Sequence, residues 1–445
     1  MSRTFAPLAI LPALALTALL FGLNDYLLFL GLTLAGAAAL LAYRHNTAAC
    51  AIWLVVTGCT LEMWLGDLLG PEAYQPIVAI VKAVGLLLAL LAALRFGPRL
   101  DPFNPAYAYA FMFASGLVHG LHPGLTVADS LRSLAGSAAP FAFSFSRLSR
   151  RWTNQIIRIT AWTPLIDVAL GAAFNALGIR PLFIDAGGWR LAALSHPAFL
   201  AGFALAGIYA SLIELFRTGA NRWLALLLAN LAILLLTGAR APATYGLAVI
   251  ALSLAFAPSF AFPRARRLGF VLGLFVCLPT ILLSAGDLTG LRLFNAVFSY
   301  PGDLSGRDEL WPAFEQAAAN SPWLGWGLGA GNTIIPPTSR VAETLHTWAA
   351  HNEYLRMEVE GDQIGRALLI LLFALWCWRN SSPLPASDRV IIRLAFIAFA
   401  CHAVTDNVLI STSASVLFTF IAAVFARGRL EAEDHTAPAP YRTFA

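Results

Sequence analysis

The sequence predicts an all-α, polytopic membrane protein with about twelve, and up to fourteen, transmembrane helices and one large loop outside the membrane. Hydrophobic residues make up 59% of the chain, charged residues make up 12%, and the mean hydropathy is +0.72. A soluble protein surface does not tolerate that composition. The alternating pattern of a β-barrel is absent, so we expect every span to be a helix.

Apolar segments follow one another along the whole chain. They cover residues 5-22, 26-42, 48-66, 75-94, 105-121, 130-146, 155-178, 196-216, 223-239, 241-261, 268-286, 363-378, 390-405 and 409-426. Some are shorter than the ~20 residues that cross a bilayer, so twelve spans and two re-entrant or interfacial pieces are an equally good interpretation. The first segment resembles a signal peptide, but further spans follow at once, so we interpret it as a retained first helix.

Loop arginines predict the orientation. They follow even-numbered segments, at Arg44, Arg95, Arg99, Arg147, Arg150, Arg151, Arg217, Arg222, Arg264, Arg266, Arg267, Arg379, Arg389, Arg427 and Arg429. By the positive-inside rule these loops and both termini are cytoplasmic. The other connections carry acids, at Asp25, Asp67, Glu72, Asp129, Asp185 and Asp406. Orientation therefore explains the net charge of +5 better than nucleic-acid binding does.

The same pattern predicts four parts of the chain. Residues 1-286 form transmembrane helices, 287-362 an outward loop that carries the catalytic residues, 363-426 the C-terminal transmembrane helices, and 427-445 a cytoplasmic tail. The loop is far longer than compact proteins leave without a purpose. The cysteines lie in or beside apolar spans, and they form no readable disulfide framework or zinc site.

The stretch TWAAHNEYLRMEVEGDQIG, residues 347-365, gathers polar residues in this apolar chain. Its spacing predicts a helix that enters the next span with His351, Tyr354, Leu355 and Glu358 on one face. A histidine at the outer end of a span can accept a proton near neutral pH. The alternative is an interfacial histidine that bonds to its own loop.

Arginines on the outward side suggest an anion site. Arg240, in LLLTGARAPATYG, lies at the outer end of a span, where snorkelling is the alternative explanation. Arg307, in SGRDELW, lies on the same side. Two guanidinium groups near a histidine would form a clamp for a diphosphate. The run from Gly325 to Gly331 either cradles a phosphate through its N–H groups or is a plain glycine-rich turn.

Taken in order, TGAR, SGRDELW, WLGWGLGAGN and HNEYL resemble the O-antigen ligase and O-antigen polymerase superfamily of bacterial envelope glycosyltransferases. The resemblance covers roughly residues 185-380. It implies a metal-independent transferase without a cofactor, which moves a glycan from undecaprenyl diphosphate to a hydroxyl on the periplasmic side. The resemblance also implies that Arg240 and Arg307 hold the diphosphate and that His351 is the base of an inverting displacement. The family often has Gly-x-x-Gly after the His-Asn turn, and Asp362 stands where its first glycine is expected.

Further candidates surround these three residues. Glu353, Glu358 or Glu360 could orient the histidine or bind sugar hydroxyls. The substrate-binding candidates are Asn352, Glu353, Tyr354 and Arg190. The outward side has no Asp-x-Asp pair, which fits a site without a metal ion.

Three functions remain open, all in the inner membrane with the site facing the periplasm. A ligase joins the lipid-linked glycan to lipid A-core, whereas a polymerase extends a lipid-linked O-antigen or exopolysaccharide. The partners are then the undecaprenyl diphosphate-linked donor, a lipid A-core or lipid-linked glycan acceptor and membrane lipids, with no nucleic acid. A flippase is less favoured, because it would keep its charges in a cavity among the spans. A protein-directed oligosaccharyltransferase of the same superfamily ranks low.

Overall fold

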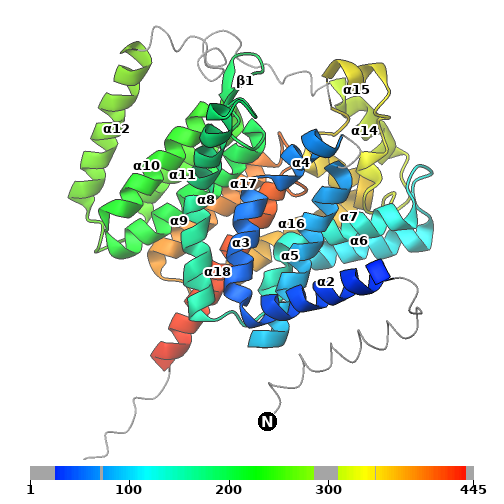
Figure 1. The fold of residues 1–445 in the computed structure, drawn as a ribbon, viewed down its shortest axis with the longest axis horizontal. Coiled ribbons are helices and arrows are strands. Elements are labelled where there is room, and N and C mark those ends of the chain that lie inside the picture. Colours follow the sequence, from blue (N-terminus) through cyan, green and yellow to red (C-terminus); the bar gives the residue numbers. More distant parts are fainter. Residues whose placement is uncertain (1–25, 71–73, 285–308, 346, 437–445) are drawn as a thin grey trace, which may run out of the picture.

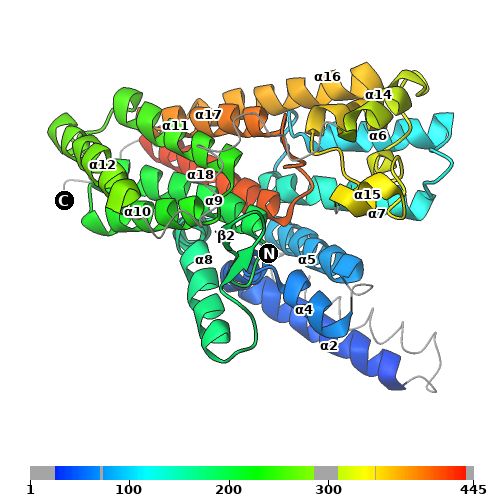
Figure 2. The same cartoon turned by 90° about the horizontal axis from the view of Figure 1, so that it is seen from above.

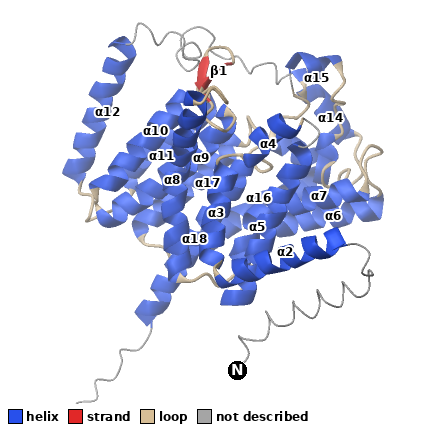
Figure 3. Cartoon of the chain, viewed as in Figure 1, coloured by secondary structure: helices blue, strands red, loops and turns tan. Residues whose placement is uncertain are grey.

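The computed structural model describes residues 26–70, 74–284, 309–345 and 347–436. Arg307 and the predicted segment 5-22 lie outside these residues. The chain is 74% helical, which confirms the all-α prediction. In the described ranges the strands form one hairpin, β1 (Phe183–Asp185) and β2 (Trp189–Leu191), and Figure 3 shows how small it is beside the helices.

By length and apolar character, five described helices could cross a membrane, or six if one bent pair counts as a span. The five are α5 (Tyr74–Phe96), α8 (Arg150–Ala176), α9 (Pro197–Thr218), α16 (Glu353–Ser381) and α18 (Thr412–Thr436). The pair consists of α2 (Tyr26–Arg44) and α3 (Asn46–Gly58), which meet at 109°. The protein is a helical membrane protein, but the predicted twelve to fourteen spans are not confirmed in the described residues.

Helix breaks and short helices explain why the described residues contain fewer candidate spans than the sequence predicts. The predicted segment 48-66 is not one helix. Helix α3 ends at Gly58, and α4 (Leu61–Leu69) begins after Thr60, whose φ of 42° is left-handed. Similarly, segment 130-146 divides into two helices next to Pro140. Several remaining helices are shorter than a full span: α6 (Ala106–His119), α7 (Val127–Ala138), η2 (Ala139–Phe145), α10 (Asn221–Leu236), α11 (Arg240–Phe256) and α17 (Ala386–His402). A further helix, α12 (Arg264–Ser284), follows α11.

Helix α9 lies at the centre of the bundle. It contacts α8, α10, α11, α17 and α18, and 89% of its apolar window is buried inside the protein (Figure 1). For α18 the corresponding share is 83%. Most of the surface of α9 and α18 contacts protein and not lipid. These two helices therefore form the core around which the others are arranged.

The arginine-rich loops meet at one end of the bundle. Arg217 on α9 bonds Asp388 on α17 at 2.6 Å and Glu431 on α18 at 2.7 Å. Arg427 bonds Glu214, and Arg150 bonds Asp434. Helix α18 continues to Thr436, so residues 427-436 are not a separate tail but a helix held by ion pairs. The β-hairpin lies at the opposite end of the molecule (Figure 1).

Part of the predicted loop 287-362 folds against α16. Helices α14 (Trp311–Ala319) and α15 (Arg340–Leu345) and the short turn η5 (Ala330–Asn332) share an apolar cluster with the first turns of α16. Figure 2 shows α14 lying along α16. Because α16 begins at Glu353, the predicted boundary at 362/363 falls inside a helix, at a kink.

Candidate active site

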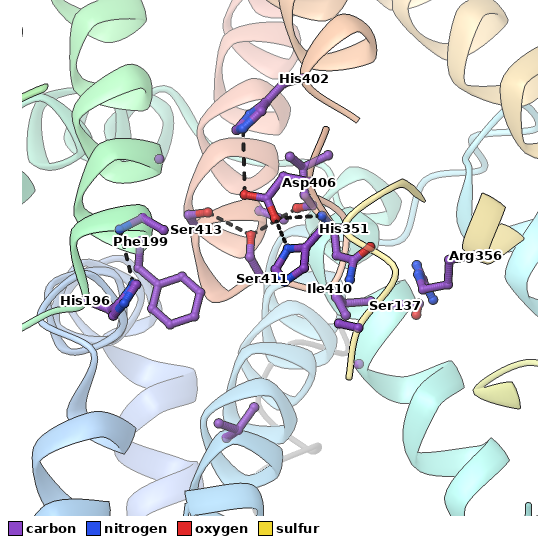
Figure 4. Close-up of a pocket in the computed structure, with 18 of the residues that line it drawn as sticks. Ser137, His196, Phe199, His351, Arg356, His402, Asp406, Ile410, Ser411 and Ser413 are labelled. Atoms are coloured by element: carbon purple, nitrogen blue, oxygen red, sulfur yellow. Dashed lines mark hydrogen bonds and ion pairs between the residues drawn. The ribbon is translucent and has the colours of Figure 1, made fainter. Parts of the chain in front are cut away.

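A pocket of about 1100 Å³ opens between the helices at the end that carries the β-hairpin (Figure 4). Side chains from α5, α7, α9, α11, α16, α17 and α18, from η5 and from the loops around residues 349 and 406 line it. His351, Arg240 and Arg190 are among the lining residues. The structure therefore brings two of the three predicted catalytic residues to one cavity, while Arg307 lies outside the described residues.

His351 precedes α16 rather than lying on it. Its φ is 47°, and Asn352 is the N-cap, whose side chain accepts bonds from the N–H groups of Tyr354 and Leu355. The N–H of Glu353 donates to the carbonyl of Ala403 at 2.8 Å. The prediction that His351 lies on one face of this helix is therefore wrong. Instead, the cap and the bond to the end of α17 fix where the histidine stands.

Polar groups contact both ring nitrogens of His351. Nδ1 lies 2.9 Å from Oδ1 of Asp406, and Nε2 lies 3.0 Å from the hydroxyl of Thr347. A carboxylate only accepts hydrogen bonds, so we assign the proton to Nδ1. Nε2 is then an acceptor that faces a hydroxyl, which is the state a general base requires. His402 approaches the other oxygen of Asp406, at 3.8 Å.

None of the glutamates expected to orient the histidine does so. Glu353 and Glu360 bond Arg356 in a buried cluster, with 3.0 Å from Arg356 Nη1 to Glu360. Glu358 bonds Arg366 at 2.5 Å. These pairs are spaced three, four and eight residues apart and tie α16 to itself. Asp406, which the sequence identified only as an outward acid, has the orienting position instead.

The glycine-rich run supports the kink in α16. Asp362 has φ 50° and ψ −163°, which breaks the helix and leaves carbonyls of the preceding turn without helical partners. The N–H groups of Trp326 and Gly327 donate to the carbonyls of Val359 and Glu360, at 2.9 and 3.1 Å. These N–H groups are thus not available to a phosphate, and the plain-turn interpretation holds for them.

Close approach explains the glycine at position 325. Its φ is 83°, and a Cβ there would lie 2.4 Å from the backbone nitrogen of Gly361. Asp362 adopts a conformation that only glycine adopts without strain. The backbone of the turn is therefore in a glycine-like conformation at an aspartate.

Of the remaining candidates, Arg240 and Arg190 line the pocket and the others do not. Arg240 is the first residue of α11 and is partly buried. Buried Arg190 donates from Nε to the carbonyl of Thr237 at 2.8 Å, so it ties β2 to the loop before Arg240. Tyr354 donates its hydroxyl to the carbonyl of Ala400 at 2.9 Å. Tyr354, Asn352 and Glu353 are not among the residues that line the pocket.

Lys82 and Thr347 were not predicted from the sequence as site residues. Lys82 on α5 lines the pocket and donates to the carbonyl of Ile410 at 2.9 Å. A lysine inside an apolar span is itself a signal of function, and it could have been used. Thr347 had no such signal, because its role depends on a contact with His351. Among the described residues, no three His, Cys, Asp or Glu side chains gather as metal ligands, and metal independence stays a prediction.

A family model described as O-antigen ligase matches residues 223–361. The match supports the resemblance in the motifs and contains Arg240, Arg307 and His351, but it ends before Asp406. No curated protein and no solved structure matches the chain.

Proposed function

We propose that this member of the O-antigen ligase superfamily, matched over residues 223–361, transfers a glycan from undecaprenyl diphosphate to a hydroxyl of lipid A-core. One observation carries the proposal: His351, with Asp406 behind it, and Arg240 line the same pocket. A base and a guanidinium group at one cavity suit a reaction in which a hydroxyl loses a proton while a diphosphate leaves.

The base acts through Nε2 of His351. The Thr347 side chain turns away from Nε2, the acceptor hydroxyl takes its place, and this hydroxyl gives its proton to Nε2 as its oxygen attacks the anomeric carbon. Asp406 accepts the Nδ1–H bond, holds the ring in place and stabilises the imidazolium that forms. The new glycosidic bond forms as the bond from the anomeric carbon to the diphosphate breaks, so the configuration inverts.

Arg240 stabilises the leaving group. Charge on the diphosphate oxygens increases as the glycosidic bond breaks, and a planar guanidinium group donates to two such oxygens at once. Arg307 has the same role in this proposal, from a segment outside the described residues. The leaving group is already an anion, so it needs no general acid, and the proposed reaction needs no metal ion.

A deletion strain tests the function through its glycans. Loss of a ligase leaves long chains on the lipid carrier and none on lipid A-core, as we expect here. Single repeats on lipid A-core would instead identify a polymerase, and absence of any outward glycan would identify a flippase. Either of these patterns contradicts the proposal.

Purified protein in liposomes tests the chemistry. With lipid-linked glycan and lipid A-core we expect transfer in excess EDTA at the rate found without it. Loss of transfer that magnesium or manganese restores would overturn the metal-independent mechanism while leaving the ligase assignment in place.

A further inference from the structure

The pocket extends to both sides of His351. In Figure 4, His196 and Phe199 of α9 lie on one side of the histidine, and Ser137 of α7 and Arg356 lie on the other. Arg240 belongs to the first side, because α11 packs against α9 and α17. The two sides therefore offer different surfaces to the two substrates of the proposed reaction.

The side formed by α9 and α18 combines apolar side chains with the polar His196 and Ser413. Phe199, Leu205 and Leu417 line it, next to Arg240. This combination suits a lipid diphosphate, since apolar side chains contact the chain and the arginine contacts the phosphates.

The opposite wall has the chemistry that saccharides require. Trp348 is 41% exposed and lines the pocket next to Ala349. Its indole offers a flat apolar face to the C–H side of a sugar ring and an N–H to a hydroxyl. Trp311 lines the same wall and is fixed by a 2.9 Å bond from its indole N–H to the carbonyl of Ala350.

Polar side chains complete this wall. Asp129 and Arg132 of α7 line the pocket, pair at 3.2 Å and remain 42% and 62% exposed. Asn332 is exposed and lines the pocket beside Thr333. The hydroxyl of Thr333 lies 3.0 Å from Nδ1 of His122, and burial lowers the pKa of that histidine. The wall thus offers carboxylate, guanidinium and amide groups, which together donate to and accept from sugar hydroxyls.

The direction of the displacement selects the substrate for this wall. In an inverting displacement the attacking oxygen and the leaving oxygen lie on opposite sides of the anomeric carbon. Arg240 marks the side of the leaving diphosphate, so the acceptor must reach His351 from the side away from Arg240. That side is the wall of Trp348, Asn332 and α7.

We infer that the wall formed by Trp348, Asn332, Asp129 and Arg132 binds the saccharide of the acceptor and presents one hydroxyl to His351. The inference rests on the proposed function and assigns the second substrate of the same site. Trp348 is the specificity-determining side chain, because its stacking face has to match the ring that carries the attacking hydroxyl.

Initial rates with purified protein in liposomes test this inference. We vary rough-type lipopolysaccharide, which consists of lipid A and core, at saturating undecaprenyl diphosphate-linked glycan, and then reverse the roles. Trp348→Ala and Asn332→Ala should raise the KM for lipopolysaccharide at least about tenfold, as loss of an aromatic anchor typically does. The donor KM should stay within about twofold, and Trp348→Phe should recover part of the loss.

Trp323 supplies the control. It is 83% exposed and does not line the pocket, so Trp323→Ala should change neither KM. A raised donor KM with an unchanged acceptor KM would assign the wall to the donor glycan and overturn the inference. Equal changes in both KM values, or no change, would overturn it as well.

A binding measurement separates this inference from the proposed function. Without donor, wild-type protein should bind rough-type lipopolysaccharide, and Trp348→Ala should bind it at least about tenfold more weakly. If wild-type protein binds and shows this difference but transfers nothing, the transfer proposal fails and the saccharide wall stands. Equal binding by both proteins overturns the wall, whatever the transfer rate.

Discussion

The two ends of the bundle use arginine in different ways. At the end where the predicted cytoplasmic loops meet, Arg217 directs its whole guanidinium group to Asp388 and Glu431. At the pocket end, Arg240 borders a cavity of about 1100 Å³. An arginine whose N–H groups are all bonded to protein carboxylates stabilises the fold, whereas we propose that Arg240, beside the cavity, binds the diphosphate. Position at the pocket does not by itself decide the role, because Arg356 also lines the pocket and is bonded to Glu353 and Glu360.

The largest effect concerns which end faces which compartment. In a background with exposed Cys401 replaced by serine, a cysteine at Ser339 should react with an impermeant thiol reagent in cells with a permeabilised outer membrane. A cysteine at exposed Ala265 should stay unlabelled until the inner membrane is opened. The reverse pattern would place the pocket end in the cytoplasm and remove the proposed acceptor from reach.

The second-largest effect is expected from replacing His351, the proposed base. His351→Gln should lower kcat for glycan transfer by about 10²- to 10⁴-fold, the usual contribution of a general base, without weakening donor binding. Exposed His119, at the end of α6, supplies a control, and His119→Gln should transfer normally. Near-normal transfer by His351→Gln would mean that the histidine has only a structural role.

A matched pair of arginine variants sharpens the comparison of the two ends. Arg240→Lys should raise the donor KM by about 10- to 100-fold, the equivalent of one lost bond to a charged group, with an unchanged thermal midpoint. Arg217→Lys should do the opposite and destabilise the fold by about 1–3 kcal/mol with an unchanged KM. Equal behaviour of the two variants would contradict the division between the ends.

Removal of the carboxylate behind the base should have a smaller effect. Asp406→Asn keeps the shape but can donate to Nδ1 and favour the wrong tautomer, so kcat should fall more than about tenfold, though less than in His351→Gln. Asp185→Asn, on an exposed residue of β1, is the control and should leave kcat unchanged. An unchanged kcat in Asp406→Asn would show that the hydrogen bond between Asp406 and His351 does not contribute to catalysis.

The smallest effect is expected at the kink. Asp362→Gly should raise stability by about 1 kcal/mol, because glycine adopts φ 50° and ψ −163° without steric cost. The thermal midpoint in detergent measures this change, and Asp362→Ala is the control that should bring no gain. A lower midpoint for the glycine variant would show that the aspartate side chain stabilises the turn more than the backbone strains it.

Properties that depend on composition were predictable from the sequence. The helical class and the membrane location follow from the apolar fraction, and the motifs led to His351 and Arg240. The number of spans did not follow, because the break at Thr60 depends on a left-handed backbone conformation that hydropathy does not register. Local spacing also could not reveal a contact between residues far apart in the chain.

Asp406 illustrates that second limit. It lies 55 residues from His351, in a different loop, and the fold alone brings the two side chains to 2.9 Å. The nearby glutamates were more attractive candidates because helical spacing put them close in sequence, yet a buried arginine already occupies two of them. Proximity along the chain thus favoured partners that stabilise a helix over the one that orients the histidine.

Helix α18 connects the two ends as a single rigid rod. Ala414 and Leu417 near its start line the pocket, and Arg427 and Glu431 near its finish hold the ion pairs with α9 and α17. A chain cut before Glu431 therefore loses more than a tail. We expect it to leave Arg217 with one carboxylate fewer, to loosen the anchored end of α18, and through this helix to loosen the cavity wall beside His351.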